Sequence, residues 1–146
     1  MKTSPRGIEL IKRFEGLALQ VYSDAAGYKT IGYGHVLQAG EDAIFANGIT
    51  EADAEDLLVA DLAHAERTVS RNARSDLNQN QFDALVSLCF NIGSRRFKTS
   101  TVLRLANARA GLDVPLALLQ WRKSGGVILK GLVRRRLEEG LLYLAD

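Results

Sequence analysis

Two carboxylates nine residues apart, Glu15 and Asp24, lie in a segment whose pattern excludes one continuous helix. Each helical residue turns the chain by about 100°, so the two side chains would face opposite sides of a single helix. Gly16 ends an apolar helical pattern, and Gly27 closes a turn between two strand-like runs. We therefore expect a helix that ends at Glu15, followed by a chain reversal that brings the second carboxylate back toward the first.

The segment contains candidate catalytic residues: Glu15, Asp24 and Thr30, whose hydroxyl follows Asp24 by six residues. A carboxyl group at a helix end and a second in a nearby loop fit acid and base roles in glycosidic bond cleavage. The negative end of the helix dipole favours the protonated form of Glu15, which a general acid requires. Taken singly, each has an ordinary interpretation: a surface glutamate, a turn aspartate and a β-favouring threonine.

The N-terminal half predicts helix, small sheet, loop and helix in that order. Ser4 and Pro5 suit the start of the first helix. β-Favouring residues around glycines predict a small antiparallel sheet over residues 17–36, and residues 40–48 are predicted to be loop. Thr50 caps a helix of about 20 residues with an acidic first turn.

The C-terminal half predicts a series of helices. Residues 78–81 cap a core helix that stops at Gly93. Further elements are predicted as helices from Ser100, from Asp113 to near Trp121 and from about Leu132 to Leu144, with a loop at 124–126. Because strands and helices are segregated along the chain, the sequence predicts the α+β class.

Composition argues against several kinds of site. Cys89 is the only cysteine, which excludes an internal disulfide and a cysteine-rich zinc site, and its apolar neighbours predict a buried residue. His35 and His64 are the only histidines, which argues against a transition-metal enzyme. We expect no metal and no cofactor. The 146 residues suffice for one compact domain or for two small lobes that share a helix.

The net charge of +2 conceals an asymmetry. Residues 1–75 carry 8 basic and 11 acidic side chains, a charge of −3, and residues 76–146 carry 11 and 6, a charge of +5. A basic half suits a polyanionic partner, either cell-wall polymer or nucleic acid. No apolar stretch is long enough for a signal peptide or a membrane span, so we expect a soluble cytoplasmic product.

The spacing Glu15-x8-Asp24-x5-Thr30 resembles the catalytic signature of the phage-type lysozymes, or endolysins, of glycoside hydrolase family 24. Four segments resemble the same family in the same order: the strand 30–35, the core helix 77–93, the turn and helix 97–103, and the arginine-rich helix 131–138. The resemblance covers essentially the whole chain.

This resemblance implies a lysozyme-like, two-lobed α+β fold, with residues 1–146 forming a single lysozyme domain. A small lobe that contains the antiparallel sheet, about residues 14–50, would be joined by a long helix, about 51–71. The helix would lead to a mainly helical lobe that comprises about residues 76–146 and the N-terminal helix.

The resemblance also implies hydrolysis of the β-1,4 bonds between N-acetylmuramic acid and N-acetylglucosamine in bacterial peptidoglycan, for host cell lysis. Glu15 would be the general acid, and Asp24 and Thr30 would position the attacking water. We expect peptidoglycan as the partner of a monomer of phage or prophage origin, with no integral membrane segment. The protein would stay in the host bacterial cytoplasm until a separate membrane-permeabilising protein releases it to the periplasm and the cell wall.

The resemblance gives supporting and binding roles to further residues. Arg135 is expected to reach the helix end that carries Glu15. His35 and Asp61 are expected to form an ion pair, which would raise the pKa of His35. The residues expected to line the sugar cleft are Gly34, Val36, Phe90, Asn91 and Ser100.

Other functions stay open at this point. A lytic transglycosylase needs only an acid/base glutamate, and a catalytically inactive peptidoglycan-binding module could keep the cleft alone. The presence of both Asp24 and Thr30 favours hydrolysis. Arg134 and Arg136 are expected to face solvent or anionic wall polymer, and because no recognition helix accompanies them, we expect no nucleic-acid partner.

Overall fold

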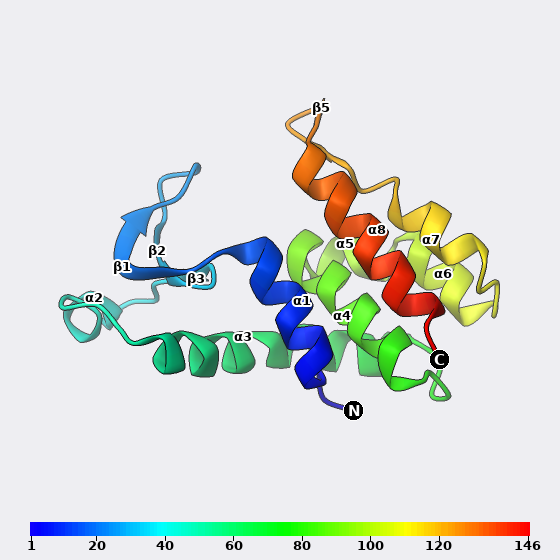
Figure 1. The fold of residues 1–146 in the computed structure, drawn as a ribbon, viewed down its shortest axis with the longest axis horizontal. Helices are drawn as coiled ribbons and strands as arrows, with labels where there is room; N and C mark the ends of the chain where they lie inside the picture. The colour runs from blue at the N-terminus through cyan, green and yellow to red at the C-terminus, as the bar shows by residue number, and fades with distance from the viewer. The chain divides into compact units, whose positions relative to one another are not determined.

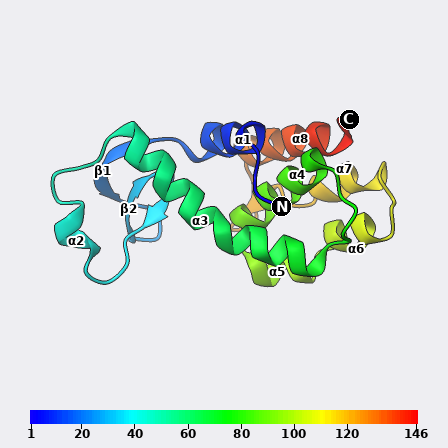
Figure 2. The same cartoon turned by 90° about the horizontal axis from the view of Figure 1, so that it is seen from below.

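The computed structural model describes residues 1–146 without a gap. The chain divides into two compact units. We call Ile11–Leu62 the sheet unit, and Met1–Leu10 together with Ala63–Asp146 the helical unit. Figures 1 and 2 show the course of the chain through both units. The division falls within helix α1 (Pro5–Glu15) and within helix α3 (Glu51–Asn72).

The sheet unit contains one three-stranded antiparallel sheet in the order β1-β2-β3, shown in blue to cyan in Figure 1. Its strands are β1 (Ala18–Ser23), β2 (Lys29–Gly32) and β3 (His35–Val36). In β2, Thr30 pairs with Tyr22 of β1 and with Val36 of β3, and Ile31 is fully buried. The small antiparallel sheet predicted from the sequence is thus confirmed.

One helical turn lies within the segment that was predicted to be loop. Helix α2 spans Glu41–Ile44 and follows Gly40, whose φ of 87° lies in the left-handed region. Glu41 and Asp42 occupy its first turn, where acidic side chains interact favourably with the helix dipole. A single turn is too short to produce a periodic apolar pattern, so no pattern in the sequence predicts this helix.

The helical unit is built around α4 (Gln79–Ile92), in which every residue from Phe82 to Cys89 is buried. The predicted cap is confirmed, because the Asn78 side chain accepts from the Gln81 N–H while the Gln81 side chain accepts from the Asn78 N–H. Helix α4 packs most extensively on α8. The remaining elements of this unit are α5 (Ser94–Lys98), α6 (Thr101–Asn107), α7 (Asp113–Leu118), β4 (Lys123–Ser124), β5 (Val127–Ile128) and α8 (Lys130–Leu144).

Two predicted helix boundaries differ from the structure, and the predicted loop at 124–126 is flanked by two short strands that were not predicted. Helix α7 ends at Leu118, three residues before the expected Trp121, and α8 begins at Lys130 rather than near Leu132. The predicted loop at 124–126 is the turn of a hairpin, because Gly125 and Gly126 both adopt positive φ, 57° and 78°. Two successive positive φ angles are characteristic of the tight turns that join two short antiparallel strands.

A glycine inside α8 has a packing role. Gly140 is buried, and a Cβ atom at this position would lie 3.1 Å from Pro115 Cβ of α7. Glycine weakens an isolated helix by about 1 kcal/mol relative to alanine. Here its missing side chain lets α8 approach α7 closely, so the local cost is offset by packing between the two helices.

The arginine cluster of α8 is mostly buried rather than solvated. Arg136, expected to face solvent or wall polymer, is 1% exposed, which corrects that prediction. Its Nη1 donates to both carboxylate oxygens of Glu139, at 2.7 and 2.6 Å. Arg135 Nε lies 3.2 Å from the same carboxylate, and the Ser87 hydroxyl of α4 donates to it at 2.6 Å. A buried acid three residues further along α8 therefore determines where the arginines point.

We expect Glu139→Gln to lower the free energy of unfolding by about 3–5 kcal/mol, because it removes the buried negative charge to which both Arg135 and Arg136 donate. Urea denaturation followed by circular dichroism measures the effect. Glu51→Gln is the matched control, since Glu51 is exposed in the first turn of α3 and its change should stay within about 1 kcal/mol. Equal stability of the two variants would show that the buried network is not a major source of stability.

Candidate active site

Glu15 is the last residue of α1 and is half-buried. Gly16 ends the helix, since its φ is 72° and its N–H donates to the Lys12 carbonyl at 3.1 Å. The turn between β2 and β3 lies beside the Glu15 side chain, because a Cβ atom on Gly34 would be 3.2 Å from Glu15 Oε2. The bare Cα of Gly34 therefore leaves room for the carboxyl group.

Asp24 follows β1 and organises a tight turn with one of its two carboxylate oxygens. Oδ1 accepts from the backbone N–H of Ala26 at 2.9 Å and from that of Tyr28 at 2.8 Å. The Asp24 N–H donates to the Tyr28 carbonyl at 2.9 Å. Its other oxygen, Oδ2, makes no protein hydrogen bond, and the residue is half-buried. The side chain is thus held in one orientation and retains one carboxylate oxygen for a further partner.

Thr30 is hydrogen-bonded to the backbone of the same residue, Tyr28. Its Oγ1 donates to the Tyr28 carbonyl at 2.9 Å, and the residue is 2% exposed. The N–H and the carbonyl of Tyr28 both bind Asp24, and the same carbonyl also accepts from Thr30. The backbone of Tyr28 therefore links these two residues. Sequence reasoning did not single out Tyr28. The position four residues after a turn aspartate was the only available signal for it.

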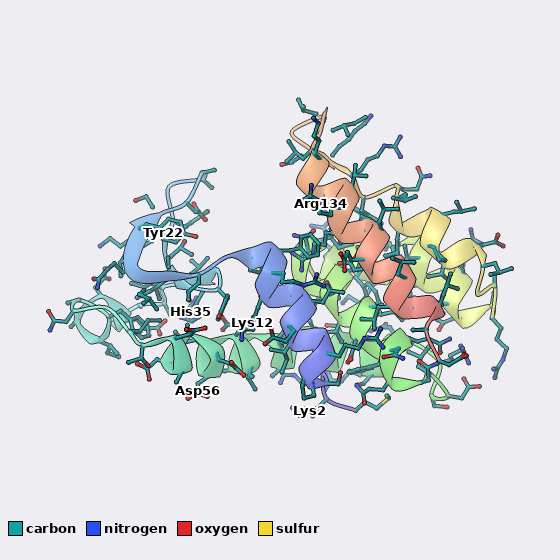
Figure 3. The ribbon with its side chains drawn as sticks, viewed as in Figure 1. Lys2, Lys12, Tyr22, His35, Asp56 and Arg134 are labelled. Atoms are coloured by element: carbon teal, nitrogen blue, oxygen red, sulfur yellow. The ribbon has the colours of Figure 1, made fainter.

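His35 holds β3 to two helices of the sheet unit; Figure 3 labels its side chain. Its Nδ1 lies 2.8 Å from Asp61 Oδ2 of α3, and its Nε2 lies 3.2 Å from Glu41 Oε1 of α2. The edge of the ring packs against Phe45, with ring centroids 6.0 Å apart. The structure thus brings together the two residues expected to pair and adds Glu41 as a second acid.

Opposing effects set the protonation of this cluster. Burial alone would lower the pKa of His35, but the hydrogen bonds and negative charges of Asp61 and Glu41 outweigh it, so the pKa is raised above its ordinary value. The backbone N–H of Gln38, which donates to Glu41 at 2.6 Å, lowers the pKa of Glu41, and His35 adds to this effect. The cluster therefore favours a protonated imidazole between two carboxylates.

The other residues expected to line the cleft occupy different elements. Val36 is exposed in β3, opposite Thr30. Phe90 is half-buried in α4, and the exposed Asn91 accepts from Arg136 Nη2. Ser100 is buried as the cap of α6, because its Oγ accepts from the Leu103 N–H at 3.1 Å and donates to the Phe97 carbonyl at 2.7 Å.

Three further features bear on the sequence predictions. Arg135 donates to Glu139 and to Ser87 within the helical unit, and its expected approach to Glu15 stays a prediction. Cys89 is buried as predicted, and burial raises the pKa of its thiol. None of the helices combines the length and the apolar composition needed to cross a bilayer.

The Phage lysozyme family model matches residues 12–139 of this chain. The chain belongs to the phage lysozyme family. It is 43% identical over 143 residues to the endolysin of Salmonella phage P22, and the match covers 97% of each chain. The resemblance found in the sequence is thus confirmed as family membership.

Comparison with a longer relative and with a solved structure extends this result. The chain is 41% identical over 146 residues to the endolysin of Bacillus phage B103, but it spans only about half, 54%, of that protein. The muramidase domain of SpmX from Asticaccaulis excentricus has a TM-score of 0.88 and 40% identity, over 99% of each chain. These comparisons confirm the predicted α+β class and the lysozyme-like fold.

The histidine cluster predicts a pH-dependent stability for this phage lysozyme family member. Because the folded pKa of His35 is raised, its contribution is complete below its unfolded pKa of about 6.5 and is lost as the pH rises through the folded pKa. We expect the thermal midpoint of His35→Asn to fall well below that of the parent at pH 5.5, and the gap to narrow toward pH 8.5.

Thermal melts of both proteins across this pH range check the prediction. His64→Asn is the matched control, because His64 is the other histidine and is exposed on α3. Its melting profile should follow the parent at every pH. A constant gap between His35→Asn and the parent would mean that the cluster contributes packing but no linked proton.

Proposed function

We propose that this chain is a lysozyme that hydrolyses the β-1,4 bonds between N-acetylmuramic acid and N-acetylglucosamine in bacterial peptidoglycan. In this proposal Glu15 is the general acid, and Asp24 with Thr30 positions the attacking water. The observation that carries the proposal is the backbone of Tyr28. Its N–H donates to the Asp24 carboxylate and its carbonyl accepts from the Thr30 hydroxyl, while Oδ2 of Asp24 stays available. Membership of the phage lysozyme family supports it.

The directions of the hydrogen bonds at Tyr28 determine how Asp24 and Thr30 would hold a water molecule. The single hydroxyl proton of Thr30 is donated to the Tyr28 carbonyl, so toward a water Thr30 can only accept. An ionised carboxylate also only accepts, and Oδ2 of Asp24 is the oxygen without a protein donor. A water bound between them would place its two hydrogens on Asp24 and Thr30, which directs an oxygen lone pair outward toward the anomeric carbon.

Glu15 would supply the proton for the departing sugar. The glycosidic oxygen of an unactivated sugar is a poor leaving group. Protonation of this oxygen as the glycosidic bond breaks therefore lowers the activation barrier. The side chain is half-buried and stands against Gly34, where the absence of a Cβ keeps its Oε2 uncrowded. The negative charge of Asp24 would in turn stabilise the positive charge that develops on the sugar ring. Attack by a separate water, rather than by Asp24 itself, predicts inversion at the anomeric carbon.

We further propose supporting roles for residues around the triad. His35 with Asp61 would hold β3, and therefore the adjoining turn at Gly34, against α3. Arg135 would position Glu15. The residues proposed to line the sugar-binding cleft remain Gly34, Val36, Phe90, Asn91 and Ser100.

The same proposal includes the biological setting. The chain would act as a monomeric, single lysozyme domain over residues 1–146, with the division near 14–50, 51–71 and 76–146 expected from the sequence. Relatives that carry the name endolysin come from phages, and we propose release from the host cytoplasm to the wall at lysis with the help of a membrane-permeabilising protein.

A lytic transglycosylase is the alternative to exclude by experiment. Such an enzyme forms an anhydro-sugar end without a bound water, so it has no use for the acceptor pair at Asp24 and Thr30. Mass spectrometry of wall digests separates reducing ends from anhydro ends. Anhydro products would replace the hydrolytic mechanism, and the absence of any product would favour a binding module.

We expect Glu15→Gln to lower turnover of purified cell walls by about 10²–10⁴-fold, because glutamine keeps the shape of the side chain but carries no acidic proton. Clearance of a wall suspension measures turnover, and a thermal melt shows that the variant is folded. Glu51→Gln makes the same chemical change on an exposed helix residue and should clear walls at the parental rate. Near-parental clearance by Glu15→Gln would exclude Glu15 as the acid.

Asp24→Asn distinguishes the role of Asp24 in organising its turn from its proposed role in catalysis. An asparagine oxygen can still accept from Ala26 and Tyr28, but its amide nitrogen replaces Oδ2 and donates instead of accepting. The fold should persist while turnover falls by about 10²-fold or more.

Two substitutions of Thr30 test whether its hydroxyl helps to hold the attacking water. Thr30→Val removes the acceptor hydroxyl and should lose a large part of the activity, whereas Thr30→Ser keeps the hydroxyl and should retain most of it. The same wall assay applies to both variants. Equal activity of the valine and serine variants would remove Thr30 from the water site.

A further inference from the structure

The hairpin β4–β5 is an exposed element that adds nothing to the core. Every residue from Lys123 to Gly131 is exposed. Its base is closed by the Leu129 N–H, which donates to the Arg122 carbonyl at 3.0 Å. Figure 1 shows the hairpin projecting beyond the first turn of α8. We call residues 122–134 the basic hairpin segment.

The aliphatic tip of this segment is formed by Val127 and Ile128 of β5, which directly follow the turn at Gly125 and Gly126. Val127 is 62% exposed, Ile128 54% and Leu129 43%. Because successive side chains of a strand point to opposite faces, Val127 and Ile128 make both faces of the exposed hairpin aliphatic. Neighbouring exposed aliphatic residues on a projecting element mark an interaction site more often than scattered single ones do.

The charged residues of the basic hairpin segment are all basic. No aspartate or glutamate occurs between Asp113 and Glu138. Lys123, Lys130 and Arg134 are exposed and make no ion pair, in contrast to the buried Arg136, which binds Glu139. Figure 3 labels Arg134 on the part of α8 that follows the hairpin.

We propose that the basic hairpin segment binds the surface of an anionic phospholipid bilayer, with Val127 and Ile128 entering the headgroup region and the flanking cations pairing with lipid phosphates. Wall polymers and nucleic acids also offer negative charge, but they provide no hydrocarbon layer for the aliphatic tip. A lipid interface provides both partners at the same place. This inference concerns a surface outside the proposed catalytic residues and goes beyond the proposed function.

Sedimentation with vesicles tests the proposal. The parent protein is expected to bind vesicles of phosphatidylcholine with phosphatidylglycerol, and to bind vesicles of phosphatidylcholine alone at least tenfold more weakly. Each cation near an anionic surface contributes about 1 kcal/mol, so Lys123→Gln with Lys130→Gln should weaken binding about 30-fold. Val127→Ser with Ile128→Ser should weaken it at least about tenfold.

Two matched controls test whether vesicle binding depends on the hairpin or on exposed aliphatic and basic residues in general. Leu112→Ser with Leu116→Ser removes aliphatic residues that are even more exposed, at 80% and 65%, near and on α7. Arg67→Gln with Arg71→Gln removes two exposed cations from α3. Both control variants should bind the anionic vesicles within about twofold of the parent.

Several results would overturn the proposal. They are a parent protein that does not bind anionic vesicles, hairpin variants that bind like the parent, and control variants that lose as much binding as the hairpin variants. Binding of soluble wall teichoic acid that also depends on Val127 and Ile128 would assign the hairpin to a polymer instead. Glu15→Gln should bind vesicles like the parent, so failure of the lysozyme mechanism and failure of lipid binding are distinguishable.

Discussion

The buried carboxylate of Glu139 is the interaction on which the helical unit depends. It has no exposed surface, and it accepts hydrogen bonds from Arg135 and Arg136 of its own helix and from Ser87 of α4. A buried ion pair contributes less net stability than its short distances suggest, because two charges lose their hydration. The hydrogen bond that Glu139 accepts from Ser87 nevertheless ties α8 to α4 at a defined point, and its charge holds Arg135 and Arg136 in the interior.

In the sheet unit, two of the proposed catalytic residues are held by hydrogen bonds to the backbone of one residue, Tyr28, rather than by a buried charge. The backbone of Tyr28 binds both Asp24 and Thr30, which links the turn after β1 to the start of β2. His35 then joins the next strand to Asp61 and Glu41 on two helices. The three proposed catalytic residues and Gly34 all belong to this unit or to the end of α1 within it, and rigid support of this kind is what a positioned water requires.

Basic residues of the C-terminal half occupy two different environments, one buried and one exposed. Arg135 and Arg136 turn inward because an acid lies three or four residues further along the helix. Lys123 and Lys130, only a few residues earlier, have no acid within reach and stay in solvent beside an aliphatic tip. The positive charge of the C-terminal half is therefore partly structural, and the part that remains for an external partner is smaller than the sequence total suggests.

Features that depend on neighbours along the chain were determined by the sequence alone. The end of α1 at Glu15, the cap of α4 at Asn78 and the small antiparallel sheet all follow from residues a few positions apart, because caps, turns and alternation are local interactions. The spacing of Glu15, Asp24 and Thr30 pointed to the family for the same reason.

Other features were decided only by the tertiary structure. The burial of Arg136, the second acid Glu41 at His35 and the contact of Gly140 with Pro115 join residues whose proximity no local pattern encodes. Whether an arginine is solvated or buried depends on whether a distant element brings it an acid and removes its water, and that is a property of the packed chain.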